Sequence, residues 1–159
     1  MFNKQFVSPA ANFAKNFYTF YLEDSSFIDD QWCYQLRFVP KRDGDMTFLG
    51  NMWIHDTTYA VKKVTMNVSE SANINYVQAL QIEHEFDQVA PEIWMLTSEK
   101  MVADLKVTKK SNVYGFFGRR HSTRKNFVVN QARPDEFYRS TSTVDILDSA
   151  DSRSDEYWA

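Results

Sequence analysis

Cysteine is nearly absent from this sequence, and proline and glycine are scarce. Cys33 is the single cysteine among 159 residues, so the chain cannot close an internal disulfide or assemble a site from several thiolates. Only four prolines and four glycines occur, which excludes collagen-like and coil-rich proteins. No apolar run approaches the roughly 18 residues that are typical of a membrane-spanning helix. The sequence therefore indicates a chain that folds around its own side chains.

A strong excess of charge of one sign is also missing. The formal net charge is −3, from 18 basic and 21 acidic residues spread along the chain. Nucleic-acid binding needs a basic patch, so we expect no nucleic-acid partner. Residues 1–21 lack a basic start, an apolar run and a small-residue cleavage site. If the protein is exported, we expect its signal to lie upstream.

Aromatic side chains are abundant, at 16% of all residues within a hydrophobic total of 43%. Aromatic residues favour strands, and a chain of this length is typical of one domain with a sizeable core. We predict a mainly β (α+β) fold, with a curved antiparallel sheet or half-barrel and one or two short helices.

Alternating apolar and polar residues predict six or seven consecutive strands. The clearest run covers residues 80–89, where every second residue from Leu80 to Phe86 is apolar or histidine and those between are polar. The acidic pair Asp29 and Asp30 is typical of a hairpin turn between two strands over residues 17–39. The other expected strands cover residues 46–55, 59–68, 93–107 and 114–129.

Residues 1–130 are expected to form the β domain, and the polar residues 131–159 a tail or linker. A short helix is predicted over residues 8–16, because Pro9 suits a first helical position and Phe13 and Phe17 are four apart. A short helical turn or crossover is expected within residues 72–79, and helical turns are expected near residues 144–147.

One face of the predicted sheet is apolar and is the candidate ligand-binding surface. Lys62 is the only charge that interrupts this face between residues 60 and 68. Methionine makes such a lining adaptable, and an apolar hollow can hold a lipid, an acyl chain or a protein segment. Alternatively, a helix or the chain's own loops fill the face, which is then ordinary core. The candidate residues are Met52, Ile54, Val64, Met66, Ile82, Phe86, Met101 and Leu105.

Residues with catalytic potential have no partners at motif spacing. His84 lies between Glu83 and Glu85, but neighbours on a strand point to opposite faces and cannot share a metal ion. We interpret His84 as a core or edge histidine, and His55 and Asp56 as organisers of a turn. We predict no catalytic residue, no metal site and no cofactor; a glycan hydrolase acting through a carboxylate pair is the less favoured alternative.

Arg119 and Arg120 are the candidate anion contacts. They follow Gly115 and Gly118, which permit a bend, and guanidinium groups bind phosphate or carboxylate. No lysine-serine ending makes this stretch a phosphate loop. The alternative is that the pair lies on a solvated strand edge or neutralises nearby acids.

The stretch GNMWIHDTT at residues 50–58 resembles the strand-turn-strand pattern of lipoprotein carrier and receptor domains with the LolA/LolB-like fold. In that pattern an aromatic-rich strand ends in Trp-Ile-Asp before a hairpin. Here His55 follows Trp53 and Ile54, and Asp56 comes one residue later. The resemblance implies a half-barrel that carries acyl chains.

A wider resemblance covers most of the chain. It is to a family of uncharacterised envelope proteins of Gram-negative bacteria, whose members carry a carboxypeptidase-regulatory-like β-sandwich upstream and an outer-membrane β-barrel downstream. The resemblance implies that this chain is their middle, periplasmic segment, tethered to the outer membrane through the full-length protein, and it implies no catalytic residues. The matching runs are YLEDSSFID (21–29), WCYQLRF (32–38), MWIHDTTYAVKKV (52–64), ANINYVQ (72–78), GFFGRRHST (115–123) and NFVVNQARPDEFY (126–138).

Two hypotheses therefore lead. The chain is a non-catalytic periplasmic module that binds a lipid, a lipoprotein acyl chain or a protein segment on its apolar face. Alternatively, it is a structural spacer or docking platform for neighbouring domains of the same protein.

Overall fold

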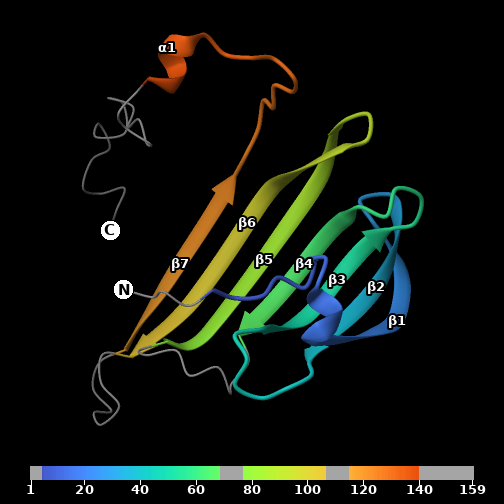
Figure 1. The fold of residues 1–159 in the computed structure, drawn as a ribbon, viewed down its shortest axis with the longest axis vertical. Helices are drawn as coiled ribbons and strands as arrows, with labels where there is room; N and C mark the ends of the chain where they lie inside the picture. The colour runs from blue at the N-terminus through green and yellow to red at the C-terminus, as the bar shows by residue number, and fades with distance from the viewer. Residues whose placement is uncertain (1–4, 69–76, 107–114, 140–159) are drawn as a thin grey trace. The chain divides into compact units, whose positions relative to one another are not determined.

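The chain folds as a mainly β protein. The computed structural model describes residues 5–68, 77–106 and 115–139. Within these residues, seven antiparallel strands form one open sheet, in which each strand pairs with the next along the chain (Figure 1). The predicted fold class is confirmed. The strands are β1 (Tyr18–Ile28), β2 (Gln31–Pro40), β3 (Phe48–His55), β4 (Val61–Val68), β5 (Val77–Ala90), β6 (Ile93–Lys106) and β7 (Gly115–Thr123).

The described residues contain two short helical elements, η1 (Ala14–Asn16) and α1 (Asp135–Tyr138). The predicted helix over residues 8–16 is wrong, because only the three-residue η1 forms there. The amides of Ala11, Ala14 and Asn16 each bond to the carbonyl three residues earlier, which is the pattern of turns and 3-10 helix. An isolated α-helix shorter than about 12 residues is marginal, and no side chain caps the start of η1.

The chain divides into two compact units, Met1–Phe127 and Val128–Ala159. The first unit holds η1 and the whole sheet. In the second, α1 starts after Pro134 with two acidic residues in its first turn, where negative charge favours the positive end of a helix.

The β1–β2 turn forms where the sequence predicted it. Asp29 (φ 48°) and Asp30 (φ 62°) both adopt positive φ, as a two-residue hairpin turn requires. The predicted last strand, in contrast, is too long, because β7 ends at Thr123 rather than near Val129. Asn126 (φ 58°) and Asn130 (φ 57°) take the left-handed conformation that asparagine tolerates, and this breaks an extended strand.

Two predictions lie outside the described residues: the helical turns near residues 144–147 and most of the crossover within residues 72–79. Residues 77–79 of that crossover belong instead to β5.

The alternation of side chains gives the sheet two different faces. On the apolar face, Met52 pairs with Val64 and Met66 pairs with Ile82 across neighbouring strands. The buried core lies here and includes Phe38 and Tyr18, both almost fully buried. On the polar face, the residues between these positions are mostly charged or hydroxylated.

Residues 5–17, which we call the cover segment, lie against the apolar face and are drawn in front of β3 and β4 in Figure 1. The Val7 amide donates to the Met46 carbonyl over 2.9 Å, and the Phe6 ring stacks on Phe48 with centroids 4.8 Å apart. The Tyr18 hydroxyl donates to the Val7 carbonyl and accepts from the Phe48 amide. These bonds fix the cover segment to the sheet.

Candidate functional site

A cavity of about 590 Å³ lies between the cover segment and the apolar face. Its floor comes from β3, β4 and β5, and it extends to Trp94 at the start of β6. One side is walled by Phe6 and by Ser8, Pro9 and Ala10 of the cover segment. Small-molecule sites typically measure about 300–1,000 Å³ and are mainly apolar, so this cavity has the size and lining of a ligand site.

Five of the eight predicted apolar residues line the cavity: Met52, Val64, Met66, Ile82 and Phe86. Ile54 packs against the buried core on the same face. The remaining two, Met101 and Leu105, lie on the β6 side of the cavity and do not line it. Met101 pairs with Ile82 and so shares its face, and Leu105 follows at the same parity.

The sequence prediction missed the other lining residues, which are Phe6, Ser8, Pro9, Ala10, Phe48, Val61, His84 and Trp94. Phe48 and His84 follow the alternation of their strands, and this alone could have identified them. The cover-segment residues carry no such signal, because only tertiary contact brings them to the sheet.

A cluster of charged side chains adjoins the cavity on the same face. Glu99 pairs with His84 across β5 and β6, and His84 lines the cavity. Glu99 is only 8% exposed; its Oε1 accepts from Arg120, and its Oε2 lies 3.0 Å from Nη2 of Arg124. We call Glu99, Arg120 and Arg124 the arginine cluster.

The pKa values of Glu99 and of the neighbouring His84 are both lowered. Hydrogen bonds from Arg124 and then Arg120 lower the pKa of Glu99 below its ordinary value, so Glu99 is ionised at neutral pH. Burial lowers the pKa of His84, and the charges of Arg124 and Arg120 lower it further while Glu99 opposes them. A neutral histidine therefore separates the apolar cavity from the charged cluster.

The predicted anion-contact pair, Arg119 and Arg120, is not brought together. Arg119 lies opposite Val102 and Arg120 opposite Met101 in the β6–β7 register, so the two side chains leave opposite faces of the sheet. Arg120 shares the face of the cavity, and there it binds the same carboxylate, Glu99, as Arg124 does.

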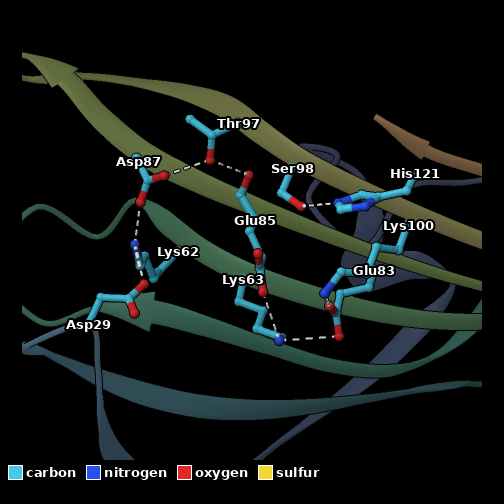
Figure 2. Close-up of polar contacts among 10 residues, drawn as sticks. All are labelled: Asp29, Lys62, Lys63, Glu83, Glu85, Asp87, Thr97, Ser98, Lys100 and His121. Atoms are coloured by element: carbon cyan, nitrogen blue, oxygen red, sulfur yellow. Dashed lines mark hydrogen bonds and ion pairs between the residues drawn. The ribbon is translucent and has the colours of Figure 1, made fainter. Parts of the chain in front are cut away.

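The polar face carries a ladder of paired charges, shown in Figure 2. Lys63 Nζ lies 3.0 Å from Glu85 and 3.2 Å from Glu83, and Lys100 Nζ lies 2.8 Å from Glu83. The hydrogen bond from Lys100, followed by that from Lys63, lowers the pKa of Glu83. Each carboxylate is held by an ammonium group, so the ladder forms a partly exposed surface of paired charges.

A second network surrounds Lys62, whose side chain is 4% exposed. Its Nζ contacts Asp87 and lies 3.1 Å from Asp29 in the β1–β2 turn. The Thr97 hydroxyl donates to Asp87 over 2.6 Å (Figure 2). Burial alone would lower the pKa of Lys62, but the hydrogen bonds and charges of Asp87 and Asp29 outweigh it and raise that pKa. The network ties the β1–β2 turn to β4, β5 and β6.

Cys33 is fully buried, and its Sγ lies 3.5 Å from the Gln31 carbonyl oxygen. Burial is the main cause that raises the pKa of this thiol. A protonated, inaccessible thiol is a core side chain rather than a nucleophile.

His55 and Asp56 make contacts within their own turn. His55 Nδ1 lies 2.9 Å from the Thr58 hydroxyl and also accepts from the Thr58 amide, while Asp56 accepts from the Thr57 hydroxyl over 2.8 Å. Such bonds organise a turn. Across residues 5–68, 77–106 and 115–139, no group of three or more His, Cys, Asp or Glu side chains is placed to hold a metal ion. In the same ranges, no helix has the length and apolar character needed to cross a membrane.

Residues 1–122 match the model of a family described as a family of unknown function (DUF5686). No curated protein and no solved structure matches the chain.

Proposed function

The chain belongs to the DUF5686 family, whose function is unknown, and on that premise we propose that it is a non-catalytic binding module. Its apolar cavity holds the hydrocarbon chain of a lipid or of a lipoprotein. The observation that carries this proposal is the cavity of about 590 Å³ between the cover segment and the sheet.

The chemistry of the lining supports a hydrocarbon ligand. Apart from Ser8, His84 and the indole N–H of Trp94, which has no hydrogen-bond partner among the described residues, the side chains around the cavity are apolar, and two are methionines. Methionine side chains adapt to irregular apolar shapes. Each methylene that leaves water for such a cavity contributes about 0.8 kcal/mol, so affinity grows with the length of chain enclosed.

The proposed compartment is the periplasm, with the module attached to the outer membrane through the rest of the full-length protein. The support for this placement is the resemblance of residues 21–138 to envelope proteins that carry a β-sandwich upstream and a membrane β-barrel downstream. The lipoprotein-carrier pattern at residues 50–58 supports the same compartment, because carriers of that kind meet acyl chains there.

A structural role is the second candidate, and the cover segment favours it. Ala14 is almost fully buried, and Val7, Ala11 and Phe17 pack against the core, so the chain already fills part of its own apolar face. In this version the cavity is an imperfection of packing, and the domain serves as a spacer or docking platform for its neighbours.

Native mass spectrometry of the chain purified from a bacterial envelope fraction separates the two candidates. The carrier proposal predicts a bound acyl lipid, which organic extraction releases and identifies. The variant Ile82→Trp places a large ring on the cavity floor and should lower lipid occupancy at least about tenfold.

The matched control is Gln81→Trp, which adds the same ring to the exposed, opposite face of β5. It should leave lipid occupancy unchanged, and circular dichroism should show the native sheet in both variants. An apo wild-type protein that takes up no lysophospholipid or fatty acid would overturn the carrier proposal and favour the structural role.

A further inference from the structure

The arginine cluster lies in line with the cavity. Met66, Ile82, Met101 and Arg120 are successive register partners on β4, β5, β6 and β7, and all lie on the apolar face. Strands are spaced about 4.8 Å apart, so the backbone of Arg120 lies about 10 Å from that of Ile82. An arginine side chain covers much of this distance.

The cluster carries surplus positive charge. Two guanidinium groups share one carboxylate, Glu99, which leaves a net charge of one positive unit. The side chains of Arg120 and Arg124 are 58% and 43% exposed. Each guanidinium has five N–H donors, and Glu99 accepts from both groups. Donors therefore remain for a second anion, and the guanidinium geometry suits phosphate or carboxylate.

The polarity of this face changes in one direction. From β3 to β5 the cavity lining is mainly apolar and includes His84. The arginine cluster follows, with Glu99 on β6, Arg120 on β7 and Arg124 just beyond β7. A molecule that matches this order has a hydrocarbon chain and, a short distance from it, one negative charge.

We infer that the ligand is an anionic amphiphile, whose hydrocarbon chain lies in the cavity and whose phosphate or carboxylate head binds Arg120 and Arg124. This inference rests on the proposed function, since it needs the cavity to hold the chain. Glu99 accepts hydrogen bonds from both guanidinium groups and so competes with the head group for part of their donors.

The test compares two lipids with the same acyl chain below their micelle concentrations. Palmitoyl lysophosphatidylglycerol has an anionic head, and palmitoyl lysophosphatidylcholine has a zwitterionic head. Displacement of a fluorescent fatty acid gives both Kd values, and their ratio is the head-group preference. We expect wild-type protein to prefer the anionic lipid about tenfold, which is about 1.4 kcal/mol.

Arg120→Gln and Arg124→Gln should each reduce the preference at least threefold, while binding of the zwitterionic lipid stays within twofold. The matched control is Arg119→Gln, which removes the same charge from the neighbouring residue on the opposite face and should leave the preference unchanged. An equal loss in Arg119→Gln would mean that general attraction, not a site, selects the anion, and would overturn the inference.

Glu99→Gln should change the head-group preference in the direction opposite to that of the arginine variants. It keeps both arginines and raises the local charge, so the preference for the anionic lipid should increase at least threefold. This result decides the question if either arginine variant fails to fold. An unchanged or smaller preference in a folded Glu99→Gln protein would overturn the inference.

Two further probes identify the source of the anion. Myristic acid should bind with the same dependence on Arg120 and Arg124 if a carboxylate head suffices. Inorganic phosphate alone should not displace the fluorescent fatty acid; displacement at the concentrations at which the lysolipid acts would indicate a site for free anions and overturn the inference. Failure of both lysolipids to bind would defeat the proposed function, whereas equal binding of both would defeat the head-group inference alone.

Discussion

Replacing Asp87 with asparagine is expected to lower the free energy of unfolding by about 2 kcal/mol at pH 7. Lys62 is buried, and its ionic partners are Asp87 and Asp29, the latter 79% exposed. Removing one partner of a buried pair costs about 3–5 kcal/mol. The side chain of Asp87 is 50% exposed and Asp29 stays in place. Solvent screening therefore reduces the expected loss to about 2 kcal/mol.

The companion variant Lys62→Met should cost less than Asp87→Asn. Methionine is apolar and similar in length, so it fills the buried site without leaving a cation there that lacks a partner. Asp87 then keeps its hydrogen bond from Thr97 and half of its solvent contact. We expect a loss below about 1 kcal/mol, and the double variant should lie close to Lys62→Met, because the unpaired cation is gone.

The pH dependence fixes the sign of the effect. The hydrogen bonds from Lys62 and Thr97 lower the pKa of Asp87, so its stabilisation is present above the unfolded value of about 3.9 and is lost as the pH falls toward the folded value. The pKa of Lys62 is raised, so its contribution persists below the unfolded value of about 10.4. The gap between wild type and Asp87→Asn should therefore stay open from neutral pH up to about 10.4 and close in acid.

Urea denaturation followed by circular dichroism measures these differences. At pH 7 the Asp87→Asn midpoint should fall with an unchanged slope, and the melting temperature should drop by roughly 4–8 °C. Equal stability of Asp87→Asn and wild type, or a greater loss in Lys62→Met, would refute the account of Lys62 as a buried cation that depends on Asp87.

Three further predictions concern single residues. Gly50→Ala should lower the free energy of unfolding, measured by urea denaturation, by at least about 3 kcal/mol. The reason is that the added Cβ would lie 1.9 Å from the Thr65 carbonyl oxygen. At Gly118 an added Cβ meets nothing within 4 Å, so Gly118→Ala should cost under about 1 kcal/mol. Glu99, whose pKa is lowered by Arg124 and Arg120, stabilises the fold above its unfolded value of about 4.3, so the stability advantage of wild type over Glu99→Gln should disappear as the pH falls below that value. Cys33 should react with a thiol reagent only at the rate of unfolding, since burial covers it and raises its pKa; immediate labelling of native protein would contradict the buried position.

Much of the sheet could be predicted because alternation is a local signal. The period of two from Leu80 to Phe86 placed Ile82 and His84 on one face, and the register with β4 agrees. The acidic pair at residues 29 and 30 predicted the first hairpin turn for the same reason, since turn residues act within four positions of the chain.

The prediction for Lys62 was wrong because of a β-bulge between β3 and β4. Lys62 was counted as a charge on the apolar face, but the β3–β4 register skips it between Val61 and Lys63. This bulge lets Val61 line the cavity and turns Lys62 toward Asp87. A bulge shifts the parity of every residue beyond it, and no local pattern in the sequence marks where it occurs.

The prediction that grouped Arg119 with Arg120 overlooked the alternation of a strand. Adjacent residues on a strand point to opposite faces, and in β7 only Arg120 shares the face of the cavity. Arg120 and Arg124 are four apart, and this even spacing was visible in the sequence. The sequence allowed a helix or loop of the chain to cover this face, but it could not predict the contact of the cover segment with Phe48, which joins residues about forty positions apart.

The order of the strands has a consequence for how the chain acquires its structure. Because each strand pairs with the one that precedes it in the sequence, the sheet can grow during synthesis, hairpin by hairpin, with short loops to close at each step. The cover segment emerges before the sheet, and the cavity floor on β3 to β5 is complete before Arg120 and Arg124 leave the ribosome. A nascent chain stalled after β5 would therefore hold the apolar hollow without the cluster that gives it charge selectivity.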